Sequence, residues 1–179
     1  MASVGTAIIS SMTYTAAASV SLEGKAVYVI NSLPVATRKV LKAKVLTQII
    51  LVLPTALFLV VSLIFALKLS AAAAAGAVIS TVVYTVLNAE FGLFINLKFY
   101  NLNWINETAA VKSGISVMLA LFFGWIYPAA LFALYFAVAK VLTVTAYLYM
   151  TIAVSLVFDA LLYAYLRKKG PAIFQNLKA

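Results

Sequence analysis

The residues of this sequence that could do chemistry are few and lie far apart. Its four acidic residues are Glu23, Glu90, Glu107 and Asp159, and it contains no histidine and no cysteine. Without these two residue types the chain cannot form a Ser–His or Cys–His catalytic pair or the usual zinc and copper sites. Four scattered carboxylates predict no metal site. A GxxxxGK[ST] phosphate-binding loop is also absent, so we expect no catalytic residue and no enzyme acting alone.

Two of the acids are expected inside a membrane. Helical rise puts Asp159 about 10 Å into the last apolar segment, and Glu90 lies near the end of the second. A carboxylate at the bilayer centre costs roughly 2.5–3.5 kcal/mol, so Asp159 should face protein or water. A substrate or proton pathway is one role open to these two acids. A structural pairing of Asp159 with Lys, Asn or Tyr of a neighbouring helix is the other.

The composition defines the elements that position these residues. The 179 residues are 66% hydrophobic and 9% charged, whereas a soluble domain is about 25% charged. Lipid must therefore surround most of the chain. We expect a single all-α transmembrane domain, a polytopic helical bundle with four clear spans at residues 45–67, 69–95, 114–139 and 141–166. Residues 1–20 are uncharged and form a marginal fifth span.

The basic residues predict how the spans are oriented. Eleven of the 13 Lys and Arg residues fall in residues 21–44, 96–113 and 167–179, which lie on one side of the membrane if the four spans are right. Cytoplasmic loops carry the excess of Lys and Arg, so both loops and the C-terminus are predicted to be cytoplasmic. Lys68 and Lys140, at the turns of two helical hairpins, would face outside. Basic residues beside apolar runs favour anionic lipid headgroups and argue against nucleic acid, despite the net charge of +9.

Residues 21–44 are predicted to form a cytoplasmic amphipathic segment. One face of a helix there gathers Leu22, Ala26, Val29, Ile30 and Leu33. Such a helix lies at the membrane boundary, and Pro34 would end it. Thr37 is then expected to cap a second helix that continues into the first clear span. Binding of headgroups alone and docking of a partner both remain open for this segment.

The cytoplasmic loop at residues 96–113 has an unusual mixture of aromatic and amide side chains. It contains Phe99, Tyr100 and Trp104 together with Asn96, Asn101, Asn103 and Asn106. A plain linker rarely needs Trp and Tyr. We therefore expect this loop to pack on headgroups or on a partner.

Taken together, the two segments resemble the permease subunits of type-2 ABC exporters. The first segment matches their first cytoplasmic loop at Glu23, Gly24, Ser32, Leu33, Pro34, Val35, Arg38, Lys39, Ala43 and Lys44. The second matches a pattern of one bacterial branch at Asn96, Leu97, Phe99, Trp104, Asn106, Glu107, Val111, Lys112 and Ser116. Tyr100 stands where proline is usual and Ser113 where glutamine is usual. The resemblance covers residues 20–179, which would be the later part of a longer permease.

This resemblance implies a multi-pass subunit of an ATP-driven exporter in the bacterial cell membrane. A separate ABC ATPase subunit would bind the ATP, so no cofactor is expected on this chain, and would drive alternating access. The residues implied in coupling to that ATPase are Glu23, Gly24, Leu33, Pro34, Trp104, Asn106, Glu107 and Lys112. Because five helices enclose little room, we expect a homodimer or a heterodimer with another permease.

Two prolines lie where they could act as hinges in the membrane helices. Pro54 and Pro128 lie inside predicted spans, where proline removes a backbone hydrogen bond and favours a kink. They are candidate hinges, although proline is also simply commoner in membrane helices.

The alternative function is a non-transporting membrane scaffold or immunity protein derived from a shortened permease.

Overall fold

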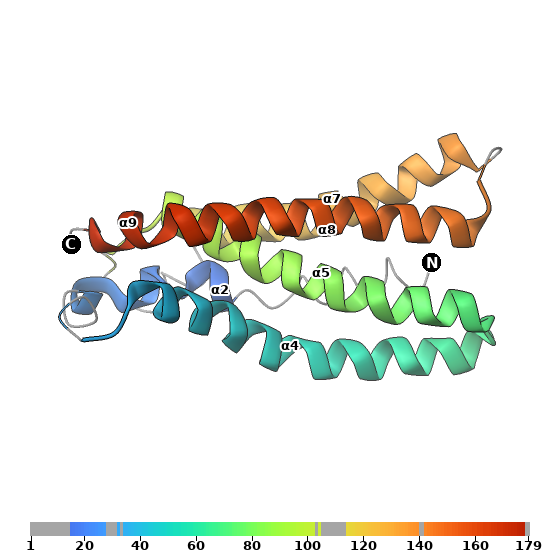
Figure 1. Ribbon diagram of the computed structural model, residues 1–179, viewed down its shortest axis with the longest axis horizontal. Coiled ribbons are helices and arrows are strands. Elements are labelled where there is room, and N and C mark those ends of the chain that lie inside the picture. The colour runs from blue at the N-terminus through green and yellow to red at the C-terminus, as the bar shows by residue number, and fades with distance from the viewer. Residues whose placement is uncertain are drawn as a thin grey trace.

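Four long helices make up most of the computed structural model, which describes residues 15–27, 32, 34–102, 104, 114–139 and 142–177. They are α4 (Thr37–Leu67), α5 (Ala71–Lys98), α7 (Ile115–Val138) and α8 (Val144–Lys168). Each is long and apolar enough to cross a membrane. The predicted all-α polytopic membrane bundle with four clear spans is therefore confirmed. Three short helices, α2 (Thr15–Ala18), η1 (Ser21–Ala26) and α9 (Gly170–Gln175), lie toward one end of it (Figure 1).

The long helices run antiparallel in two hairpins. The α4–α5 turn places Lys68 in the left-handed region, at φ 48° and ψ 49°, and the Ser70 hydroxyl caps α5 by accepting a hydrogen bond from the Ala73 amide at 3.4 Å. The Thr143 hydroxyl caps α8 in the same way, at 3.3 Å from the Ala146 amide. The start of α4 and the ends of α5 and α8 consequently meet at one end of the bundle (Figure 1).

We call this end the basic end, because it gathers Arg38, Lys39, Lys42, Lys44, Lys98, Arg167, Lys168 and Lys169. The opposite end, which carries Lys68, is the hairpin end. The described parts of the two predicted cytoplasmic segments both lie at the basic end (Figure 1). The structure therefore places them on the same side of the bundle.

Helix α5 is the central helix of the bundle. Two thirds of its apolar window (67%) is buried, against 17–28% in the other three long helices, and it packs against α2, α4, α7 and α8. Small residues allow this close approach: a Cβ atom on Gly76 would lie 2.6 Å from Leu148 Cδ2 of α8. The buried hydroxyls of Ser80 and Thr81 donate to the carbonyl of Ala77 within the same helix, at 2.9 and 2.8 Å.

The outer faces of α4, α7 and α8 are apolar and exposed. Phe58 and Phe65 of α4 are 78% and 77% exposed, and Ile126 and Phe136 of α7 are 62% and 63% exposed. Water would disfavour so much apolar surface, at roughly 25 cal/mol per Å². These faces are the lipid-facing surface of a membrane protein.

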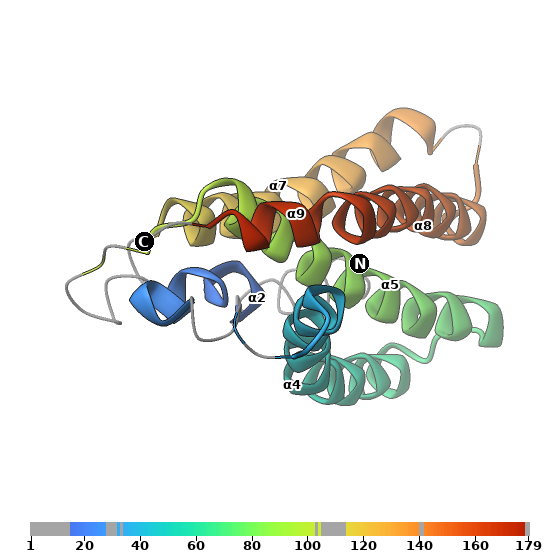
Figure 2. The same ribbon diagram turned by 60° about the vertical axis from the view of Figure 1, so that its left-hand side comes forward.

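Aromatic side chains fill the space between α5, α7 and α8. Phe91 and Phe123 stack with ring centroids 3.7 Å apart, and Tyr127 stacks on both Phe123 and Phe158. The Tyr127 hydroxyl shares a hydrogen bond of 2.9 Å with the Ser155 hydroxyl. Beyond this cluster, toward the hairpin end, α7 diverges from α8 (Figures 1 and 2).

Helix α4 begins one residue earlier than expected, and it continues without interruption into the first span. It is one continuous helix of 31 residues, about 46 Å long by helical rise, so its first turns extend beyond a hydrocarbon core of roughly 30 Å. The predicted cap at Thr37 is wrong: Ala36 occupies the N-cap position, without a side-chain bond. The Thr37 hydroxyl instead accepts a hydrogen bond of 3.0 Å from Gln175 Nε2, which ties α9 to α4.

The segment before α4 is less regular than the expected amphipathic helix. Helix η1 is interrupted at Gly24, which has φ 49° and ψ −133°. A single regular helix therefore does not run on from Leu22. Residues 28–31 and 33, as well as residues 1–14 of the marginal span, lie outside the described residues. The described end of that span, α2, is buried among the helices.

Candidate functional site

The candidate site is a buried set of polar contacts at the basic end, which we call the polar junction. Its centre is Asn96, a fully buried residue in the last turn of α5. The side-chain oxygen of Asn96 accepts hydrogen bonds from the amides of Val20 (2.7 Å) and Ser21 (3.2 Å). Its side-chain nitrogen donates to the hydroxyls of Ser21 (2.8 Å) and Ser116 (2.9 Å). These bonds use both donors and both lone pairs of the amide.

Ser21 connects this centre to the second polar segment. The Ser21 hydroxyl accepts a hydrogen bond from the Asn101 amide at 3.2 Å. The Ser21 carbonyl accepts one from the Trp104 indole nitrogen at 2.6 Å. The residues that follow α5 are therefore bonded to the residues that precede α4, across 80 and 83 positions of sequence.

Gly24 is required by the same contact. Its φ of 49° and ψ of −133° lie in a region that essentially only glycine adopts. A Cβ atom at this position would lie 2.9 Å from Trp104 Cζ2. Backbone conformation and space both exclude a side chain, so the Trp104 ring can lie directly against the turn.

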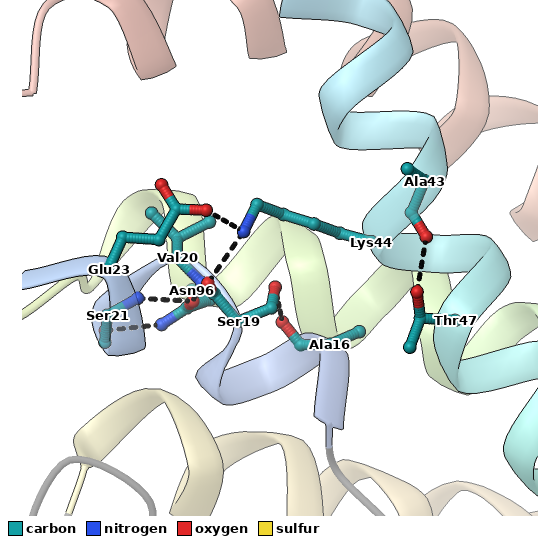
Figure 3. A network of polar contacts seen from close by, with 9 residues as sticks. All are labelled: Ala16, Ser19, Val20, Ser21, Glu23, Ala43, Lys44, Thr47 and Asn96. Carbon is teal, nitrogen blue, oxygen red and sulfur yellow. Dashed lines mark hydrogen bonds and ion pairs between the residues drawn. The ribbon is translucent and has the colours of Figure 1, made fainter. Parts of the chain in front are cut away.

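An ion pair fixes the junction to α4. Lys44 reaches across to Glu23 and also donates to the Ser19 carbonyl at 2.8 Å (Figure 3). Both charged side chains are only 13% exposed, so each charge depends on its partner. One turn further along α4, the oxygen of the buried Gln48 side chain accepts a hydrogen bond of 2.8 Å from the Ala16 amide.

Close packing continues the attachment on α5. A Cβ atom on Gly92 would lie 3.2 Å from the Ala17 amide nitrogen, and Ala16 and Ala17 are fully buried. The segment at residues 15–24 is thus held by α4, by α5, by Ser116 of α7 and by Trp104. A displacement of residues 15–24 would therefore strain contacts with α4, α5, α7 and Trp104 at the same time.

The structure joins three of the residues implied in coupling. Glu23, Gly24 and Trp104 belong to the polar junction. Pro34 is exposed and lies before the start of α4, away from these contacts. Leu33, Asn106, Glu107 and Lys112 lie outside the described residues.

The two intramembrane acids lie on helices that pack together, α5 and α8. Glu90 is 6% exposed and Asp159 is half-buried. Each has a buried carboxyl oxygen without a hydrogen-bond partner in the described part of the chain. The expected structural pairing of Asp159 with Lys, Asn or Tyr is therefore not seen at that oxygen.

Both prolines lie inside unbroken helices. Pro54 is exposed in α4, which bends along its length (Figure 1). Pro128 is buried in α7. Their role as hinges stays a prediction.

Sequence reasoning did not single out Gln48 or Ser21. The sequence around Gln48 could have indicated a buried contact, because an amide side chain within the apolar run VLTQIIL needs a protein partner if the run lies in lipid. Ser21 had none, since a serine before a helix is common.

The described residues contain no group of three or more His, Cys, Asp or Glu side chains that could hold a metal ion. The polar junction offers hydrogen bonds and one ion pair that attach residues 15–24 to the surrounding helices. No protein-family model, no curated protein and no solved structure matches this chain. The likeness to ABC permeases accordingly rests on the residues quoted above.

Proposed function

We propose that this chain is a membrane-spanning permease subunit of an ATP-driven exporter in the cell membrane. In this proposal the basic end and the C-terminus are cytoplasmic, as the excess of Lys and Arg favours. A separate ABC ATPase subunit docks at that end and binds the ATP. Its closure moves the segment at residues 15–24, and the membrane helices respond by alternating access.

The polar junction is the observation that supports this proposal most. A coupling element must pass force from a surface segment into several spans without slipping. Buried, fully used hydrogen bonds suit this task, because breaking one leaves an unsatisfied group at about 1–3 kcal/mol. Asn96 attaches the segment to α5 in this way, and the ion pair between Lys44 and Glu23 attaches it to α4.

The packed interior favours a second candidate, the non-transporting scaffold or immunity protein. Phe91, Phe123, Tyr127 and Phe158 fill the space between α5, α7 and α8. A transport pathway through one copy would have to displace this cluster. The permease proposal therefore includes a second subunit, either another copy or a different permease, with the pathway between the two.

Purification of the tagged chain from its native membranes distinguishes the two functions. The permease proposal predicts a co-purifying ABC ATPase whose ATP hydrolysis depends on this chain. Trp104→Phe removes the indole donor to Ser21 while keeping an aromatic ring, so it should reduce that hydrolysis several-fold. Lys39→Gln, at an exposed position outside the junction, is the matched control and should not change it. A stably inserted chain that brings down no ATPase would refute the permease and leave the scaffold.

A further inference from the structure

A cavity of about 280 Å³ opens between α4, α5 and α8 at the basic end. None of the polar-junction residues Ser21, Lys44 and Asn96 lines it. Three exposed cations do: Arg38 and Lys42 from the start of α4, and Arg167 from the end of α8. The cavity therefore has a basic mouth at the basic end of the bundle, formed by the first turns of α4 and the last turn of α8.

The deeper wall of the cavity is apolar. Val45, Leu46 and Ile49 continue along α4 from Lys42, and Val86 faces them from α5. Helical rise puts Ile49 about 10 Å deeper than Lys42. A basic mouth above an apolar wall is complementary to an amphiphile with an anionic head and a hydrocarbon chain.

Glu90 adds a polar group below the mouth. It lines the cavity, is 6% exposed, and has a carboxyl oxygen without a hydrogen-bond partner among the described residues. Its position in α5 is about 12 Å from the helix end at Lys98 by helical rise. In its protonated form the carboxyl group can donate to an ester carbonyl of a bound lipid. Even with Glu90 ionised, three cations against one acid leave the lining at +2.

We propose that this cavity binds one anionic phospholipid of the leaflet at the basic end. The phosphate lies among Arg38, Lys42 and Arg167, and one acyl chain follows Val45 and Ile49. Small-molecule pockets usually measure about 300–1,000 Å³, so the cavity takes the upper part of one lipid and leaves the rest in the bilayer. This site does not depend on the proposed transport role.

Native mass spectrometry of the full chain in detergent tests the site, because detergent removes the general surface potential of a bilayer. With equal amounts of dioleoyl phosphatidylglycerol and phosphatidylcholine, the wild type should retain one phosphatidylglycerol. The variant Arg38→Gln/Lys42→Gln/Arg167→Gln should bind it at least tenfold more weakly, and Arg38→Gln alone about fivefold more weakly. The single variant changes an exposed side chain and gives the same test should the triple variant not fold.

Lys39→Gln/Lys168→Gln is the matched control, since it removes exposed cations from the same two helices outside the cavity lining. This control should retain the lipid as the wild type does. Glycerol phosphate should not displace the lipid, because it has no chain to follow the apolar wall. Equal losses in control and cavity variants, equal retention of phosphatidylcholine, or displacement by glycerol phosphate would each overturn the proposal.

Discussion

Replacing Asn96 by leucine should release the polar junction. The substitution keeps a side chain of similar size but removes the side-chain oxygen that accepts hydrogen bonds from the amides of both Val20 and Ser21. Each buried amide left without a partner costs about 1–3 kcal/mol, so two such amides cost about 2–6 kcal/mol. The hydroxyls of Ser21 and Ser116 also lose a donor, but a hydroxyl can rotate toward another partner.

Hydrogen–deuterium exchange of the purified chain measures this loss locally, because a segment can open without global unfolding. At 1.4 kcal/mol per factor of ten, a cost of about 2 kcal/mol raises exchange of residues 19–24 about 30-fold. Faster exchange should be confined to this segment and its neighbours. The hairpin end, around Lys68, should keep its wild-type protection.

Asn88→Leu is the matched control for this measurement. Asn88 lies on the same helix and is 8% exposed, but it makes no hydrogen bond to another element in the described part of the chain. Its replacement should leave residues 19–24 protected. If Asn96→Leu changed their exchange by less than twofold, or if both variants changed it equally, the polar junction would not be what holds this segment.

Two further substitutions test the contacts around this centre. Gly24→Ala should destabilise the junction by about 1–3 kcal/mol through backbone strain. In a Trp125→Phe background, in which the fluorescence comes from Trp104, a soluble quencher should then quench more strongly; unchanged quenching would contradict the positive φ. Lys44→Met leaves Glu23 unpaired and should cost about 3 kcal/mol in detergent unfolding, whereas Lys39→Met should cost little. An equal effect of the two lysine variants would mean that the ion pair contributes nothing specific.

The long helices could be predicted from the sequence because a membrane span is recognised from one continuous apolar run, without knowledge of its contacts. A span needs roughly 20 apolar residues, and runs such as residues 114–139 show this without reference to the rest of the chain. The placement of the two polar segments at one end followed from the same count of spans. Even the single lysine at position 68 marked a turn correctly, since it ends α4 in the left-handed region.

The polar junction could not be predicted because its contacts are long-range. Asn96 meets Ser21 across 75 positions, and no local pattern selects that partner among several asparagines. The interruption of η1 is similar: Gly24 fits a helical wheel, and its neighbour Trp104, which leaves no space for a Cβ atom there, lies 80 positions further along the sequence. The start of α4 was missed by one residue because α9 engages the Thr37 hydroxyl.

Placement of the basic end in the cytoplasm carries the whole functional account, and cysteine labelling tests it most directly. The chain contains no cysteine, so Lys39→Cys and Lys68→Cys each introduce a single thiol, at the basic end and the hairpin end. With a membrane-impermeant maleimide on intact cells, Lys68→Cys should react, and Lys39→Cys should react only after permeabilisation. The reverse pattern would put the polar junction outside, where no ATP-hydrolysing subunit could reach it.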